Sequence, residues 1–246
     1  MKVVFHEDFY GVYALEPAGA AGRMEAVIRS LGDRFAFVQA VVAKPEDIAA
    51  VHGAKHIDYV RSQGLYEIAA LAAGGAVQAA TLGLKEPAFA LIRPPGHHAS
   101  QDDAWGFCYF NNMSVALKRL LAAGQIKTAA VLDFDLHYGD GNVNILSETG
   151  VVDLFNPEAR DRQVYLEKVT TFLENVNADI IGISAGFDNH KEDWGGLLAT
   201  EDYQLMGRLV KEAAKRTKAG YFGILEGGYN HNVLGQNVAA LLEGMS

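Results

Sequence analysis

The segment from Asp133 to His137 carries side chains that divalent metals accept as ligands. In an extended chain alternate residues face the same side, so Asp133, Asp135 and His137 can share one face. Asp188 is a further acidic candidate, and an Asp–His–Asp set leaves coordination positions open, as a catalytic zinc requires. Each acid also has an ordinary structural interpretation, as a solvated strand end or a helix cap. The combination of the two aspartates with His137, and not any one of these residues, therefore indicates a metal site.

Two adjacent histidines offer groups that transfer protons. His97 and His98 follow a Pro-Pro-Gly turn, where one can act as general base toward metal-activated water and the other as an acid or electrostatic partner. Asp133 and Asp140 are available to orient the two rings and to raise their basicity. The alternative interpretation is a loop pair whose nitrogens bond to backbone carbonyls.

Tyr229 is the third candidate for the chemistry. It follows Glu226, Gly227 and Gly228, and glycines allow backbone angles and close approaches that other residues do not. A phenol here can donate a hydrogen bond to a substrate carbonyl and stabilise the negative charge that develops on its oxygen. A packed tyrosine at the rim of the fold is the ordinary alternative.

The elements that must position these residues alternate between short apolar runs and longer amphipathic segments. This alternation predicts an α/β fold with a mostly parallel central sheet flanked by helices. The predicted strands are Val3–Phe5, Phe37–Val42, Ala88–Ile92, Ala129–Leu132, Val151–Phe155, Ile180–Ser184 and Phe222–Leu225. The predicted helices are Ala21–Leu31, Pro45–Val51, Tyr66–Thr81, Asn112–Ala123, Gln163–Asn175, Glu201–Lys215 and Val233–Leu242.

Polar residues follow four of the predicted strands directly. In parallel sheets, sites form just beyond the carboxyl ends of the strands. The apolar runs AFALI, AAVL, IIGIS and GIL lead respectively into His97-His98, His137, Asp188 and Tyr229. We therefore expect these groups, distant in sequence, to meet at one rim of one sheet.

Composition sets limits on class and partners. A chain of 246 residues, half of them hydrophobic, is enough for one large core, so we expect a single domain over residues 1–246. A net charge of −9 does not favour nucleic acid or an anionic membrane as direct partner. Cys108 is the only cysteine, which excludes an internal disulfide and favours a reducing compartment. With no apolar stretch typical of a signal peptide or a bilayer span, the sequence predicts a cytoplasmic protein.

Taken in order, the motifs RPPGHHA, GFCYFNN, DFDLHYGDG, SAGFDNH and LEGGY resemble the zinc-dependent histone deacetylase family. That family includes lysine deacetylases, acetylpolyamine amidohydrolases and acetoin-utilisation type proteins. The resemblance covers nearly the whole chain, and residues 46–61 also look like the family pattern. It implies a single deacetylase-like catalytic domain with an arginase/deacetylase-like fold.

The resemblance also implies a role for each motif residue. The metal is expected to be Zn²⁺, with Fe²⁺ as the alternative that the sequence does not distinguish. His98 is the first choice for the base, and the division of labour between the two histidines stays open. By motif match, the metal ligands are Asp135, His137 and Asp188, and the group that polarises the carbonyl is Tyr229. The tandem histidines and their carboxylate partners are His97, His98, Asp133 and Asp140. The channel is lined by Gly106, Phe107, Gly227 and Gly228.

Three departures from the family pattern affect the substrate channel. The segment ending at Val60 runs almost directly into the helix from Tyr66, without the usual long loop. The stretch from Gly141 to Ser184 is shortened. In the family, the corresponding stretch carries a second channel aromatic and part of a potassium site. Tyr138 stands where many members have histidine. We therefore expect a shallow, open site with one aromatic wall, at Phe107. The resemblance does not carry a structural potassium ion over to this chain.

The function expected from these residues is hydrolysis of an acylated amine, such as an acyl-lysine or an acylpolyamine. Two alternatives remain open at this stage: an arginase-like ureohydrolase, which needs a binuclear manganese site with further Asp and His ligands, and a binding module that keeps the fold without the chemistry. The intact set from His97 to Tyr229 argues against both. The sequence does not determine the acyl group, the amine or the oligomeric state.

Overall fold

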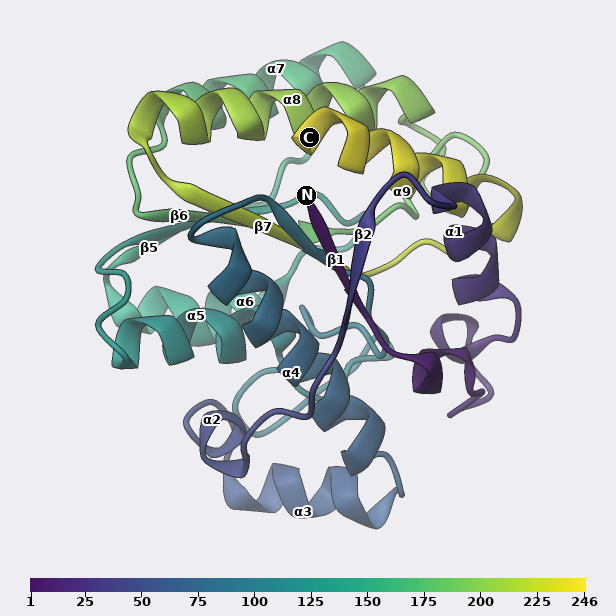
Figure 1. Cartoon of the computed structure of the whole chain (residues 1–246), viewed down its shortest axis with the longest axis vertical. Helices are drawn as coiled ribbons and strands as arrows, with labels where there is room; N and C mark the ends of the chain where they lie inside the picture. Colours follow the sequence, from purple (N-terminus) through teal and green to yellow (C-terminus); the bar gives the residue numbers. More distant parts are fainter.

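The computed structural model describes all 246 residues, and its centre is a seven-stranded sheet (Figure 1). The strands are β1 (Lys2–Phe5), β2 (Ala36–Gln39), β3 (Ala88–Ala90), β4 (Ala129–Asp133), β5 (Val152–Phe155), β6 (Ile180–Ala185) and β7 (Gly220–Leu225). They follow the order β2-β1-β3-β7-β6-β4-β5, and every neighbouring pair is parallel. The mostly parallel sheet expected from the sequence is confirmed and is parallel throughout.

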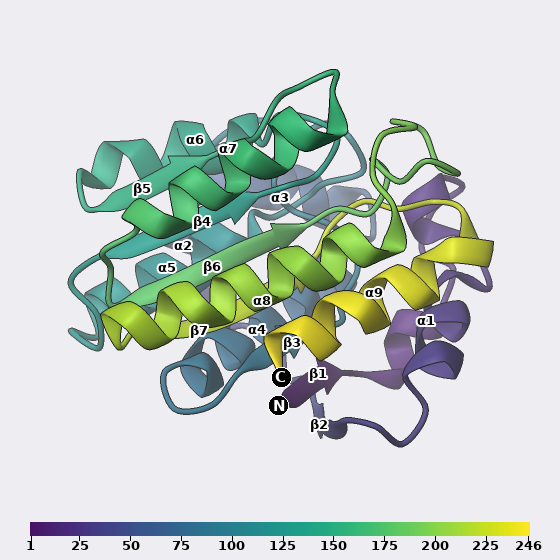
Figure 2. The same ribbon diagram turned by 90° about the horizontal axis from the view of Figure 1, so that it is seen from above.

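Helices cover both faces of the sheet, as Figures 1 and 2 show. One layer consists of α1 (Arg23–Leu31), α7 (Arg162–Asn175), α8 (Thr200–Thr217) and α9 (His231–Met245). The other consists of α2 (Pro45–Ala49), α3 (Ala54–Ser62), α4 (Tyr66–Gly83), α5 (Asn112–Ala122) and α6 (Asp140–Leu146). Three short 3₁₀ helices span Glu7–Tyr10, Pro17–Gly19 and Ser147–Thr149.

The central strands are apolar because helices cover them on both sides. All residues of β4 and β6 are buried, which is why their sequences run AAVLD and IIGISA without alternation. The main hydrophobic cluster joins residues of both helix layers through the sheet. At the carboxyl ends of the strands buried polar side chains gather, among them His97, His98, Asp133, Asp135 and Asp188.

Two predicted strands extend beyond the carboxyl ends of the observed ones, and two observed helices were not predicted. The sequence predicts a strand over Phe37–Val42, but β2 ends at Gln39 because its one neighbour, β1, ends opposite it at Phe5. The strand predicted to reach Ile92 likewise ends at Ala90. The helices α3 and α6 are absent from the prediction. The sequence of α6, DGNVNIL, has one glycine and two asparagines, which favour helix poorly.

Four neighbouring strands in the middle of the sheet, β3, β7, β6 and β4, deliver the motifs found in the sequence. Because all are parallel, their carboxyl ends lie along the same edge (Figure 2). The tandem histidines follow β3, the Glu-Gly-Gly-Tyr segment follows β7, Asp188 follows β6, and the Asp-x-Asp-x-His segment begins at the last residue of β4. The expectation that these segments meet at one rim is confirmed.

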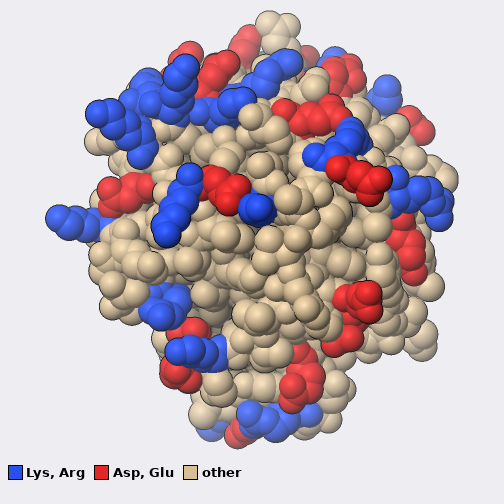
Figure 3. Space-filling view, viewed as in Figure 1, with Lys and Arg blue, Asp and Glu red and all other residues tan.

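The surface on the side seen in Figure 1 carries acidic and basic side chains side by side, with Lys and Arg gathered at its upper left (Figure 3). The surface over the edge strand β2 is largely uncharged, and Phe37 on this strand is exposed. No helix is both long enough and apolar enough to cross a bilayer.

Candidate metal and active site

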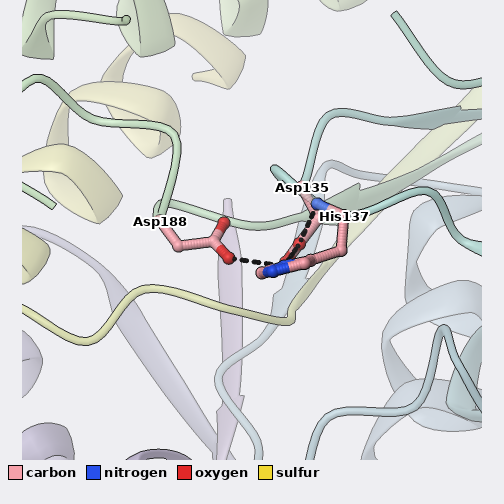
Figure 4. A group of neighbouring side chains, drawn as sticks. All are labelled: Asp135, His137 and Asp188. Carbon is pink, nitrogen blue, oxygen red and sulfur yellow. Dashed lines mark hydrogen bonds and ion pairs between the residues drawn. The ribbon is translucent and has the colours of Figure 1, made fainter. Parts of the chain in front are cut away.

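Asp135, His137 and Asp188 converge at the carboxyl edge of the sheet (Figure 4). One ligand atom from each lies within 4.8 Å of the others, and no other group of three or more His, Cys, Asp or Glu residues in the chain does so. His137 Nδ1 lies 3.2 Å from Asp135 Oδ1 and 3.0 Å from Asp188 Oδ2. The three residues named as ligands from the sequence therefore form one cluster, from the ends of β4 and β6.

Backbone N–H groups fix both carboxylates of this cluster. Asp135 accepts from Gly227 N at 2.9 Å and from His137 N at 2.9 Å, and Asp188 Oδ1 accepts from Leu136 N at 3.1 Å. The buried Asp188 Oδ2 has no backbone donor, and its nearest polar partner is His137 Nδ1 at 3.0 Å, outside good hydrogen-bond geometry. A buried carboxylate oxygen that is poorly satisfied is costly, and a cation between the three side chains would satisfy it. The donor set thus fits a divalent metal.

The electrostatics of the cluster point to the same fit. Burial and the charge of Asp135 raise the pKa of Asp188 to about 6. Hydrogen bonds to Asp135 and Asp188 raise the pKa of His137 to about 10. Two buried carboxylates thus hold a proton on an imidazole that would otherwise be largely neutral at pH 7. Metal binding would exchange this proton for the ion, since a ligating imidazole must be neutral.

The tandem histidines lie beside this cluster, each with its own carboxylate. His97 Nδ1 is 3.2 Å from Asp133 Oδ2, and His98 Nδ1 is 2.7 Å from Asp140 Oδ1. Their ring centroids are 3.9 Å apart, and His97 Nε2 lies 3.7 Å from Asp135 Oδ1. Because a carboxylate engages Nδ1 of each ring, Nε2 of each is left for chemistry.

The two histidines differ in charge. Burial lowers the pKa of His97, but the carboxylates of Asp135 and Asp133 outweigh burial and bring that pKa well above its usual value. Burial and the positive charge of His97 lower the pKa of His98 to about 4, against the opposing effect of the hydrogen bond that His98 donates to Asp140. One ring is therefore a proton donor at neutral pH, and the other is a neutral acceptor.

A buried network, not anticipated from the sequence, holds the turn that carries these rings. Glu226 Oε2 accepts from Gly96 N at 2.7 Å and from His97 N at 3.3 Å. Its other oxygen accepts from Ser184 Oγ at 3.1 Å, and Asn142 Nδ2 donates to Ser184 Oγ and to Asp133 Oδ2, each at 3.0 Å. Burial raises the pKa of Glu226 to about 7. The network links the ends of β3, β7, β6 and β4 through hydrogen bonds.

Gly106 and Phe107 lie in the loop against the tandem pair. Phe107 has a φ of 68°, a backbone conformation that costs free energy in a non-glycine residue and is often found at functional sites. Its ring centroid is 5.7 Å from that of Tyr229. Gly106 has a φ of 59°, and a Cβ on it would lie 2.4 Å from His98 Cδ2. Only glycine allows the loop to pass so close to His98.

Tyr229 lies at the end of the Glu-Gly-Gly-Tyr segment. Burial, followed by the charges of Asp135 and Asp188, raises its pKa, so its hydroxyl stays protonated and can donate. The preceding Gly227 and Gly228 are buried, and a Cβ on Gly227 would lie 2.5 Å from Asp135 Oδ2. Gly227 therefore backs the two carboxylates, whereas a Cβ on Gly228 would meet Leu234 and Phe187. That both glycines line the substrate channel stays a prediction.

Both tryptophans of the chain flank the site, and the expectation of a single aromatic wall at Phe107 is wrong. The ring of Trp105 stacks on His98 at 3.8 Å, and its Nε1 donates to Asp140 Oδ2 at 2.8 Å. The ring of Trp194 lies 4.2 Å from that of Tyr229. The sequence offers one signal for them, because each follows an acidic pair closely, in QDDAW and KEDW.

Two further histidines and one predicted loop lie outside the cluster. His190 is 1% exposed and packs against Tyr203. His231 is partly exposed and begins α9. The missing loop between the segments at Val60 and Tyr66 is confirmed, because residues 63–65 alone connect α3 to α4. A surface hollow of about 560 Å³, lined by parts of residues 6–13, 40–42 and 67–71, contains none of the site residues.

The fold and this site define an α/β protein with an Asp–His–Asp cluster and paired histidines at the carboxyl edge of a parallel sheet. Residues 19–156 and 154–245 match the histone deacetylase domain, and the chain belongs to that family. It is 28% identical to a probable deacetylase of Methanothermobacter thermautotrophicus, over 99% of this chain and 90% of that protein. The family and fold implied by the motifs are thereby confirmed.

Two further comparisons extend this result. The chain is 30% identical to the acetylpolyamine amidohydrolase of Mycoplana ramosa, over 75% of this chain and 64% of that protein. Its structure matches the crystal structure of the HDA15 HD domain with a TM-score of 0.85 and 23% identity, covering 99% of this chain and 90% of that one. The relatives are thus deacetylases and amidohydrolases, and the structural match shows the shared fold.

Proposed function

We propose that the chain, as one catalytic domain over residues 1–246, is a metal-dependent deacylase that hydrolyses the amide of a small acylated amine or an acyl-lysine. The observation that carries the proposal is the cluster of Asp135, His137 and Asp188 beside two histidines that each have a carboxylate partner. The relative named acetylpolyamine amidohydrolase supports the choice of a small acylated amine.

Asp135, His137 and Asp188 would hold Zn²⁺, the first choice, or Fe²⁺. When bound, the ion polarises the amide carbonyl and makes water more acidic. A second metal is not supported, since the chain contains one such cluster, and this argues against a binuclear ureohydrolase.

The side chains around the cluster would share the proton transfers. Nε2 of His98, whose Nδ1 donates to Asp140, accepts a proton from the attacking water. The water oxygen forms the new bond to the carbonyl carbon, and the Tyr229 hydroxyl donates a hydrogen bond to the carbonyl oxygen as negative charge develops. The C–N bond then breaks, and His97 donates its proton to the leaving amine.

The test is turnover of a panel of acylated amines by the zinc-loaded protein, with free amine as the readout. The panel contains acetylated diamines, acetyl-lysine peptides and amides with longer acyl groups. Arginine, with urea as the product, serves as the ureohydrolase comparison. Release of amine that is lost in His98→Ala supports the proposal. Urea release, or no turnover of any amide by metal-loaded protein, would contradict it.

A further inference from the structure

Trp194 is a large apolar side chain that is half-exposed to solvent and lies beside the site. It is 54% exposed, and its ring centroid lies 4.2 Å from Tyr229, 6.0 Å from His137 and 6.5 Å from Phe107. Three of the residues assigned to the chemistry or its channel are therefore its neighbours. About half of the Trp194 side chain is left uncovered by the protein beside these residues.

Trp194 is held in this position by its own loop. Asp193 Oδ2 accepts from Tyr229 N at 2.8 Å and from Asn230 N at 2.7 Å, and Asp193 Oδ1 accepts from Trp194 N at 2.9 Å. On the other side, Gly195 N donates to the carbonyl oxygen of Asp188 at 2.8 Å. The indole is thus fixed between the loop of a metal-ligand candidate and the loop of Tyr229.

The aromatic rings form a corner and not a parallel slot. Trp194 is tilted over Tyr229, with 33° between the ring planes, whereas Phe107 meets Trp194 at 67°. A corner of π-faces suits an aliphatic chain that ends in a compact ammonium group, because ring faces attract cations. The carboxylate of Asp193 adds negative charge next to the backbone of Trp194.

We propose that Trp194 is a specificity-determining residue that, with Phe107, receives the amine half of the acylated substrate and favours one that carries a positive charge. This inference rests on the proposed deacylase function and adds the substrate class. In the family pattern, a second channel aromatic lies between Gly141 and Ser184, in the stretch that is shortened in this chain. Trp194, in the loop after β6, would supply a second aromatic contact in its place.

A pair of amides that differ only in charge tests this inference. N-acetyl-1,4-diaminobutane ends in an ammonium group, and N-pentylacetamide has a methyl group in its place. In Trp194→Ala, we expect KM for the charged amide to rise about two- to thirtyfold, the range of a cation–π contact, with kcat little changed. KM for the neutral amide should rise less. Trp194→Phe should keep most of the preference for the charged amide. Tyr59→Ala, which removes a 58% exposed aromatic side chain on α3, should change neither KM.

Tryptophan fluorescence gives a second readout that does not need turnover. The chain has two tryptophans, so Trp105→Phe leaves Trp194 as the only emitter and Trp194→Phe leaves Trp105. Titration of zinc-loaded Trp105→Phe with 1,4-diaminobutane, the product amine, should change the emission of Trp194 saturably.

The outcomes separate the two proposals. If the native protein hydrolyses no amide of the panel, the deacylase function fails, and the fluorescence titration still tests Trp194. If it hydrolyses the amides but Trp194→Ala shows an unchanged KM, or an equal rise for both, the role of Trp194 is overturned while the function stands. An emission from Trp194 that does not respond to the diamine would also overturn it.

Discussion

Replacing Gly106 by alanine adds a methyl group against the ring of the proposed base. The new Cβ would lie 2.4 Å from His98 Cδ2, about an ångström inside ordinary van der Waals contact. The ring has little room to move, because His97 lies 3.9 Å from it and Trp105 stacks on it at 3.8 Å. Either His98 shifts, or the loop carrying Phe107 moves away.

The size of the effect follows from that displacement. A misplacement of about 1 Å at a reacting group can cost about a hundredfold in rate. We therefore expect Gly106→Ala to lower kcat by about one to two orders of magnitude. The positive φ of 59° adds a backbone cost of about 1–2 kcal/mol for a residue with a Cβ. Zinc content should not change, since the substitution touches none of the three proposed ligands.

The chain offers a matched control for the backbone cost. Gly124 has a φ of 64°, and a Cβ on it would meet nothing within 4 Å. Gly124→Ala should lose similar stability in urea unfolding and keep native kcat on the best acylated amine of the panel. If Gly106→Ala keeps native kcat with full zinc occupancy, the loop does not constrain His98 as the geometry says, or His98 is not the base.

Three further changes test other parts of the account. His98→Ala should lower kcat by about 10²–10⁴-fold while zinc is retained, and near-native kcat would exclude His98 as general base. Glu226→Ala should lower the free energy of unfolding by about 3 kcal/mol or more, because buried donors on Gly96 and Ser184 lose their acceptor. If the free energy of unfolding in urea changes by less than about 1 kcal/mol, the network does not stabilise the fold. Acetyl-lysine peptides should show a poor kcat/KM that resides in KM, since an open site buries little of the peptide; a tight preference for such peptides by a monomer would refute the open site.

The ends of β4 and β6 could be predicted because their signals are local. Their sequences begin with the apolar runs AAVL and IIGI, so the approximate position of Asp133 and Asp188 follows from where each apolar run stops. The rule that parallel strands bring their carboxyl ends to one edge then groups residues that are far apart in sequence. The grouping of Asp135, His137 and Asp188 depends on nothing more.

What the sequence did not predict depends on contacts through space. Glu226 reads as part of a glycine-rich turn, and its hydrogen bonds to the tandem-histidine turn arise only because β3 and β7 are neighbours. Trp194 reads as an isolated surface residue until Asp193 ties its loop to Tyr229. The short helix α6 has weak propensity, and it forms where Asp140 and Asn142 meet the partners provided by other strands.

The most direct test of a metal-dependent deacylase is a zinc titration of chelator-stripped protein with amide hydrolysis as the readout. The rate should rise linearly and stop rising at one zinc ion per chain, because Asp135, His137 and Asp188 form the one cluster of this kind. Asp188→Ala should show no such rise and little bound zinc. Hydrolysis that persists in stripped protein, or an Asp188→Ala variant that binds and responds to zinc like the native chain, would contradict the account.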